Sequence, residues 1–326
     1  MNLKNLTLFS GLLGFVVVAL GAWTRLADAG LGCPDWPGCY GFATIPINPE
    51  EISVANGRFP ETPYELAKAI PEVVHRYFAA TLGLFIIGIF VAASRNNKVS
   101  GRDKKLSLFL LFWVIMQGTF GYLTVSLKLW PQVVTTHLMS GFLTTVIVWL
   151  LYFKFKDQDQ DSVKRNPWNL SPNMKRFVTL SIVLVSFQIF LGAWTSTNYA
   201  SFACTDFPLC QGELLPPANF SGGFDFFQDI GPNYLGGQLD QESRVAIHLT
   251  HRFGAIFVIS ALGLLIFSLF KLGLVKVSLG LSGVLLLQVL LGISNVIFHL
   301  PLLIAVGHNL GGLLLVTYLS VLRFRE

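Results

Sequence analysis

The chain has 326 residues, a length that could hold two soluble domains. Hydrophobic residues make up 53% of it and charged residues only 13%, and the mean hydropathy is +0.60. This composition excludes two water-facing globules and a disordered chain, and the basic residues do not form a face for nucleic acid. We therefore expect an all-α, polytopic membrane protein.

Eight apolar runs are long enough to cross a bilayer core of about 30 Å as helices, which takes roughly 20 residues each. The first run continues through Gly21-Ala22-Trp23-Thr24 without a small-residue cleavage pattern, so we interpret it as an anchor and not as a signal peptide. In chain order the predicted helices cover residues 6–24, 72–93, 106–127, 133–155, 177–197, 245–270, 277–298 and 302–322.

The distribution of basic residues predicts the orientation of these helices. With the N-terminus inside, most of the 23 lysine and arginine residues lie in cytoplasmic connections and ends. The positive-inside rule then places both termini in the cytoplasm, and we expect the membrane to be the inner membrane of a bacterium. The net charge of +5 follows from this topology and requires no acidic partner.

All four cysteines fall in the first and third outer loops of this topology. The space outside a bacterial inner membrane is oxidising, which favours disulfides over free thiols. We expect the pairs Cys33–Cys39 and Cys204–Cys210, because the two pairs lie far apart in the sequence. A metal site is less favoured, since a Cys-x5-Cys spacing is not a zinc pattern. A redox role for one pair stays open.

An internal repeat organises the chain. The segment 21–24 recurs 171 residues later at 192–195, and the same shift carries 33–39 onto 204–210. We predict two parallel, pseudo-symmetric four-helix halves, residues 1–156 and 176–326, joined by a cytoplasmic linker at 157–175. Single residues also recur at this shift: Gln117 with Gln288, Gly121 with Gly292, and His137 with His308.

Four of the six histidines occupy duplicated positions, each in the outer part of an even-numbered helix. Two imidazoles on facing helices of a four-helix bundle can ligate a haem iron axially, which would pair His75 with His137 and His251 with His308. A lone membrane histidine is as often structural, but a duplicated pair at matched depth favours ligation. Zinc is the weaker alternative, because the nearby carboxylates do not complete a tetrahedral set.

Other residues on these helices fit a haem less specifically. Arg76 and Arg252, and also Arg25, could pair with haem propionates, with salt bridges or lipid phosphates as the equal alternative. His299 has no repeated counterpart, and we interpret it as structural. Glycines could make room for a macrocycle, although close helix packing explains any single one as well. They are Gly83, Gly118, Gly121, Gly141, Gly254, Gly292, Gly311 and Gly312.

The two halves differ one helical turn before the first histidine of each pair. Glu72 precedes His75, whereas His248 precedes His251. Residues three apart share a helix face, so Glu72 could transfer a proton or stabilise positive charge beside its haem. The difference suggests that one haem is chemically changed and the other carries electrons. The alternative is that Glu72 is a helix N-terminal carboxylate after Pro71.

Taken together, these features resemble the haem A synthase family, membrane enzymes of cytochrome oxidase assembly. The resemblance covers essentially the whole chain. It is carried by Glu72-x-x-His75-Arg76, by His251-Arg252, by single histidines at 137 and 308, and by Gly30-Leu-Gly-Cys33-Pro-Asp-Trp-Pro-Gly-Cys39.

The resemblance implies an activity and a set of roles. The reaction would be the oxidation of the C8 methyl group of haem O to the formyl group of haem A. The first half would hold the substrate haem between His75 and His137, with Glu72 as the catalytic carboxylate. The second half would hold a haem b between His251 and His308. Haem O synthase and oxidase assembly factors are the implied partners, besides membrane lipid and an electron donor that the sequence does not identify.

The main alternative is a di-haem b-type electron-transfer cytochrome, which would use the same four ligands but has no need for the difference between Glu72 and His248. A non-catalytic haem carrier is a third interpretation. A transporter is disfavoured, because its best sign would be interrupted helices at the membrane midplane. The sequence leaves open the source of the formyl oxygen, a homo-oligomer and the ligation of the substrate iron during turnover.

Overall fold

The computed structural model describes residues 2–159, 168 and 170–325. Within these residues regular structure is helical apart from two isolated bridges, and eight helices are long and apolar enough to cross a membrane. They are α1 (Leu3–Leu26), α3 (Leu66–Arg95), α4 (Gly101–Ser126), α5 (Pro131–Asp159), α6 (Pro172–Thr197), α8 (Gln241–Lys271), α9 (Val275–Ile297) and α10 (Leu302–Phe324). The predicted all-α fold with eight spans is confirmed.

Local signals mark where several of these helices begin. Asn2, Ser100, Ser171 and Asp240 precede α1, α4, α6 and α8, and each accepts a hydrogen bond from a backbone N–H of the first turn. A proline opens α5 and α6, where its missing N–H has no cost. The helices therefore extend somewhat beyond the apolar runs from which they were predicted.

Helix α3 begins earlier than predicted, at Leu66 instead of residue 72. Glu72 consequently lies inside the helix, one residue after Pro71, and the helix N-cap is Glu65. The alternative interpretation of Glu72 as a helix N-terminal carboxylate is therefore wrong. The start was misplaced because Pro71 was taken as a boundary, whereas this proline lies inside α3.

The outer surfaces of the long helices are apolar. Large hydrophobic side chains lie exposed on every one of them, for instance Leu84 (66%), Ile115 (61%), Phe187 (58%), Phe257 (71%) and Leu279 (65%). In water such a surface would be strongly unfavourable, whereas lipid accommodates it. The chain is a multi-pass membrane protein.

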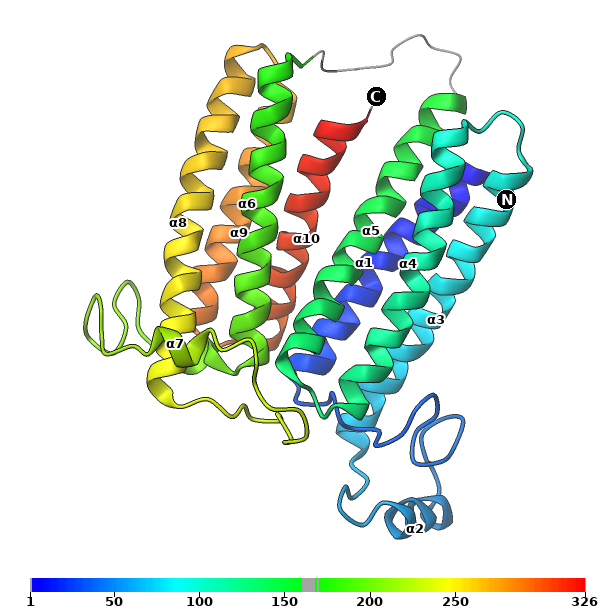
Figure 1. Ribbon diagram of the computed structural model, residues 1–326, viewed down its shortest axis with the longest axis vertical. Coiled ribbons are helices and arrows are strands. Elements are labelled where there is room, and N and C mark those ends of the chain that lie inside the picture. Colours follow the sequence, from blue (N-terminus) through cyan, green and yellow to red (C-terminus); the bar gives the residue numbers. More distant parts are fainter. Residues whose placement is uncertain (1, 160–167, 169, 326) are drawn as a thin grey trace.

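Both termini lie at one end of the helices, and the long connections lie at the other (Figure 1). These connections contain the short elements α2 (Pro49–Arg58), η1 (Ala200–Phe202) and α7 (Phe220–Gly223). The predicted linker 157–175 is partly helical, because α5 runs to Asp159 and α6 begins at Pro172. Its central residues 160–167 and 169 lie outside the described part of the chain.

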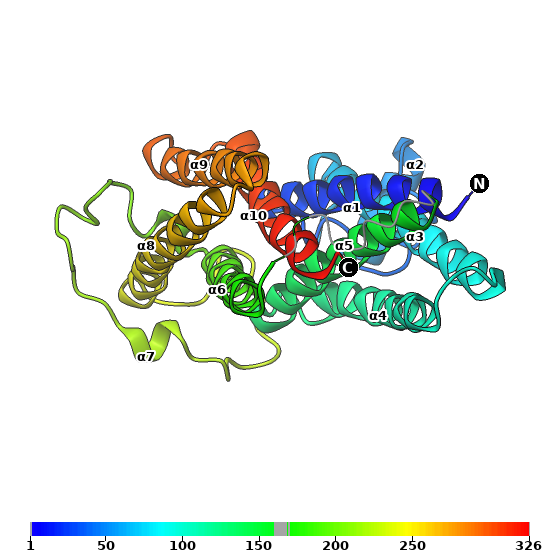
Figure 2. The ribbon, with the colours of Figure 1, turned by 90° about the horizontal axis from the view of Figure 1, so that it is seen from above.

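The long helices pack as two groups of four. Figure 2 shows the two groups side by side. In the first group α3 and α5 each pack on both α1 and α4, so α3 and α5 lie diagonally opposite each other. In the second group α8 and α10 each pack on both α6 and α9, with the same diagonal placement. The diagonal helices are the ones that carry the repeated histidines.

The two groups meet along α1, α5, α6 and α10. At the loop end of this seam, Arg25 donates to the carbonyl of Ser196, and the Tyr199 hydroxyl donates to Asp28 Oδ1 at 2.8 Å. Each of these two contacts joins residues that are 171 apart in the sequence. Contact between equivalent positions is typical of a two-fold relation, although the pseudo-symmetry of the whole chain stays a prediction.

The two cysteine loops fold in the same way. The Asp35 carboxylate accepts hydrogen bonds from the backbone N–H groups of residues 40 and 41, at 2.6 and 2.7 Å. Asp206 accepts the equivalent bonds from residues 211 and 212, at 2.7 and 2.8 Å. The N–H of Gly212 is the main cause that lowers the pKa of the Asp206 carboxyl. The repeat thus extends from the helices into the backbone of the loops.

Candidate functional site

His75 on α3 and His137 on α5 face each other across the first group. Their ring centroids are 6.4 Å apart, and the ring planes make an angle of 85°. Two imidazoles that each hold one nitrogen about 2 Å from a shared metal have centroids roughly 6 Å apart. The spacing therefore fits two axial ligands of one haem iron.

The surroundings of His75 select one of its ring nitrogens. Its Nδ1 lies 3.1 Å from the backbone carbonyl of Val17 on α1, and a carbonyl can only accept, so Nδ1 carries the proton. The other nitrogen, Nε2, then carries a lone pair that could bind a metal ion. Gly21 is required beside this ring, because a Cβ there would lie 2.9 Å from Cε1 of His75.

His137 is fixed through its backbone and by close packing. Gln117 donates to the His137 carbonyl at 2.9 Å, and a Cβ at Gly121 would lie 3.3 Å from the ring. The Nδ1 atom of His137 is buried without a hydrogen-bond partner. A repeated glycine therefore packs against each histidine of this pair.

Glu72 lies one turn before His75 and is only 4% exposed. Its Oε2 accepts a hydrogen bond from the backbone N–H of Cys33 at 2.9 Å, and its Oε1 accepts one from Arg76 at 2.5 Å. The two donors fix the orientation of this buried carboxyl group. The disulfide loop and the histidine helix thus hold the side chain between them.

The two arginines that follow the α3 and α8 histidines point to the cysteine loops. Arg76 donates to the carbonyls of Asp35 and Gly38, and Arg252 donates to those of Cys204, Asp206 and Leu209. In this structure they fasten the loops over the helix ends. Their predicted role as propionate partners stays a prediction, and Arg25 is used at the seam between the groups.

The second group surrounds its two histidines in a similar way. A Cβ at Gly192 would lie 3.0 Å from Cε1 of His251, and one at Gly292 would lie 3.0 Å from Cε1 of His308. The donor set and the glycine contacts therefore fit a second haem between α8 and α10, although the role of these residues as ligands stays a prediction.

His248 replaces the buried carboxylate in this group. Its Nδ1 donates to the carbonyl of Ala200 at 2.9 Å, and the residue is 5% exposed. This contact ties α8 to the connection after α6, which is a structural use. His299 lies just after α9 with φ of 57°, and its repeat equivalent Lys128 has φ of 48° after α4. His299 thus occupies a turn.

The four cysteines form two disulfides, Cys33–Cys39 and Cys204–Cys210, as the loop positions suggested. Both are buried beneath their loops. In the first loop Tyr40 packs beside the disulfide, and burial is the main cause that raises the pKa of its hydroxyl to about 12. Tyr40 is therefore neutral and donates to the Pro63 carbonyl at 3.2 Å.

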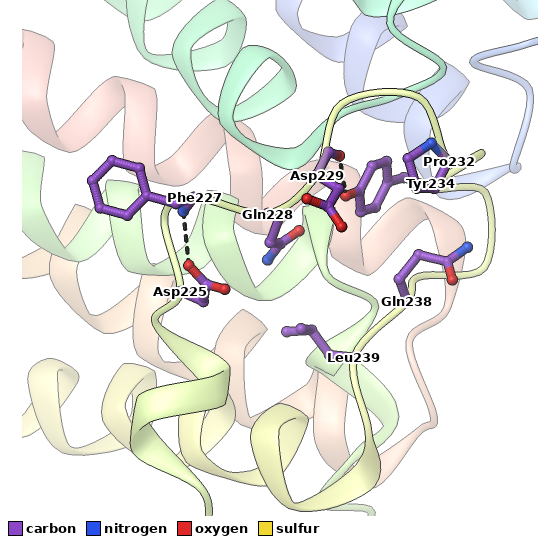
Figure 3. Close-up of a pocket in the computed structure, with 8 residues that line it drawn as sticks. All are labelled: Asp225, Phe227, Gln228, Asp229, Pro232, Tyr234, Gln238 and Leu239. Carbon is purple, nitrogen blue, oxygen red and sulfur yellow. Dashed lines mark hydrogen bonds between the residues drawn. The ribbon is translucent and has the colours of Figure 1, made fainter.

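Two other kinds of site can be compared with these histidine pairs. Among the described residues, no three His, Cys, Asp or Glu side chains come together as a metal-binding set. A cavity of about 330 Å³ lies in the connection between α7 and α8 (Figure 3). It is lined by Asp225, Phe227, Gln228, Asp229, Pro232, Tyr234, Gln238 and Leu239, and therefore contains none of the predicted ligands.

A family model described as COX15-CtaA, cytochrome oxidase assembly protein, matches residues 4–320. The chain belongs to this family. It is 42% identical over 310 residues to a protein of Shewanella oneidensis named heme A synthase, a match that covers 95% of this chain and 92% of the relative. Proteins of the same name from a Wolbachia of Brugia malayi and from Symbiobacterium thermophilum are 27% and 26% identical, over 90% and 70% of this chain and 88% and 70% of theirs.

The site of this COX15-CtaA chain contains residues that the sequence reasoning missed. Gly21 and Gly192 lie against histidine rings, although the predicted glycines did not include them. Of those predicted, Gly83 and Gly118 face open space. Gln188 on α6 was also missed. The sequence did contain a sign of its importance. The 171-residue shift aligns Gln188 with apolar Val17, and a polar residue that appears in only one copy of a membrane helix suggests a function.

Proposed function

We propose that this chain is a haem A synthase, which oxidises the C8 methyl group of haem O to a formyl group and so supplies haem A for cytochrome oxidase. Family membership and the 42% identical relative named heme A synthase support this function. The observation that carries it is the facing pair His75 and His137 with buried Glu72 one turn away.

The four helices of residues 1–156 are the substrate half, and those of residues 176–326 are the half that holds haem b. In the first half His75 and His137 bind the iron of haem O. The Val17 carbonyl keeps the proton of His75 on Nδ1 and thereby presents Nε2 to the iron. A haem b bound in the second half by His251 and His308 would carry one electron at a time.

Glu72 is the catalytic carboxylate of this mechanism. The conversion of a methyl to a formyl group replaces two hydrogens by one oxygen. It removes four electrons from the carbon, which an oxidant from outside the chain, such as dioxygen, must take up. A negative charge close to the methyl group stabilises the positive charge that develops there, and a carboxylate oxygen can accept the proton. Cys33 N–H and Arg76 hold the carboxylate in position, so that little reorganisation is needed during the reaction.

The two histidine pairs lie on the periplasmic side of a bacterial inner membrane, with both termini in the cytoplasm. The end of the molecule that holds the termini carries most of the basic residues, as the positive-inside rule requires of a cytoplasmic face. The disulfide loops lie at the opposite end, which suits an oxidising compartment.

The name of the family links the chain to oxidase assembly, and its substrate must come from an enzyme that makes haem O. Haem O synthase and oxidase assembly factors are therefore the expected partners, within membrane lipid. An electron donor is also required, and the chain can function as a monomer or a homo-oligomer.

Haem analysis tests this function directly. The chain is co-expressed with an enzyme that produces haem O, then purified, and its haems are extracted and separated by chromatography. Haem A in the extract supports the proposal. Haem b without haem A, despite available haem O, would instead support the di-haem electron-transfer cytochrome.

A further inference from the structure

We propose that Gln188 is a positioning residue that sets the reduction potential of the haem held by His251, through a hydrogen bond to the ring nitrogen that faces away from the iron. This inference rests on the proposed function, because it needs a haem b in the second half. It concerns a residue that takes no part in the histidine motifs.

The side-chain amide of Gln188 lies against the ring of His251. Its Nε2 is 3.0 Å from His251 Nδ1 and 2.9 Å from the backbone carbonyl of the same residue. The amide oxygen is buried without a partner, beside Gly254 of the next turn of α8. The amide nitrogen therefore contacts the His251 ring, while the amide oxygen makes no hydrogen bond.

Iron binding would decide which end of the amide faces the ring. An imidazole bound to iron through Nε2 carries its proton on Nδ1, and that proton needs an acceptor. The oxygen and nitrogen of a glutamine amide have nearly the same shape, so a half-turn of the amide places Oε1 beside Nδ1. The buried oxygen then gains a donor. The same half-turn sets Oε1 beside the His251 carbonyl oxygen, which now accepts from Nε2 at 2.9 Å, so the amide must also shift away from this carbonyl as it bonds to Nδ1–H. The carbonyl keeps its partner within α8.

In the first half the acceptor for the Nδ1 proton of the histidine is a backbone group and not a side chain. There the acceptor for His75 Nδ1 is the backbone carbonyl of Val17, and Val17 is the residue that the 171-residue shift aligns with Gln188. A polar amide within a membrane helix is costly unless it is used. Its presence only where a haem would carry electrons favours a role at that ligand over simple packing.

The sign of the effect follows from ligand basicity. An acceptor on Nδ1–H makes the imidazole a stronger donor to iron, which stabilises the oxidised state and lowers the reduction potential. Removal of the acceptor should raise the potential, and a carboxylate in its place should lower it further.

The test is a redox titration of purified holoprotein, followed by the absorbance of haem b, for the wild type, Gln188→Val and Gln188→Glu. We expect an upward shift of the midpoint potential for the valine variant and a downward shift for the glutamate variant. Ser181→Ala is the matched control, because Ser181 lies on the same helix as Gln188 and donates to the backbone carbonyl of Phe177. Its haem b potential should equal that of the wild type.

Two results would overturn the inference: both variants keep the wild-type potential, or both shift it in the same direction. If Gln188→Val does not accumulate with haem, the nearly isosteric Gln188→Glu decides alone, since an unchanged or raised potential contradicts the proposal. Failure of the proposed function is recognised separately, because the wild type would then yield no haem A.

Discussion

The two histidine pairs lie in similar frames of helices but have different polar neighbours. One turn before His75 stands Glu72, bound to the first disulfide loop, whereas one turn before His251 stands His248, bound to the Ala200 carbonyl. A carboxyl group is thus held one turn from one pair, and an imidazole is held at the same place beside the other pair. Under the proposed function, this difference assigns chemistry to one half of the scaffold and electron transfer to the other.

The largest expected effect is the loss of one haem without the other. His251→Ala should remove the haem b spectrum almost completely, because one of the two histidines that would hold the haem iron is lost. His299→Ala is the control, since His299 occupies the turn after α9. Absorption spectroscopy of the purified variants measures this. An unchanged haem b content in His251→Ala would refute the ligand assignment.

Glu72→Ala should separate binding from catalysis in the first half. We expect bound haem to remain while the yield of haem A falls roughly 100-fold or more, because the proton acceptor and the stabilising charge are removed. Glu65→Ala, at the exposed start of the same helix, should leave the yield near the wild-type value. Normal haem A production by Glu72→Ala would mean that the carboxylate is structural.

Gly192→Ala should weaken haem binding in the second half only. The new Cβ would lie 3.0 Å from His251 Cε1, so the ring must move away from its position, and we expect roughly a 10-fold loss of haem b affinity, as for other disturbed ligand supports. Gly263→Ala on α8 meets nothing within 4 Å and serves as the control. Haem transfer to an apoprotein acceptor measures the loss. Equal transfer rates for both variants would contradict the prediction.

The smallest effect should distinguish the two disulfide loops. Cys39→Ser opens the loop whose backbone N–H bonds to Glu72, and Cys210→Ser opens the equivalent loop, to which Arg252 donates. We expect a several-fold lower haem A yield for Cys39→Ser and a weaker change for Cys210→Ser. The ratio of haem A to haem O in the extract measures both. A reversed order would show that the second loop has the larger role.

Much of this architecture could be predicted from residue types alone. Membrane thickness and apolar runs determine the eight helices to within a few residues, and the repeat indicated which histidines would face each other. Contacts made by backbone atoms could not be predicted in this way. A backbone carbonyl is present in every residue and a backbone N–H in every residue except proline. The residue types Cys33 and Val17 therefore do not show that their backbone groups contact Glu72 and His75.

The contacts Arg25 to Ser196 and Asp28 to Tyr199 bear on how such a chain could have arisen. A dimer of identical four-helix ancestors would bring each of these positions against its own copy at the axis. In such a dimer any substitution appears twice, so a carboxylate gained at one porphyrin is gained at both. Gene fusion removes this restriction, and after it each position could evolve independently of its former copy.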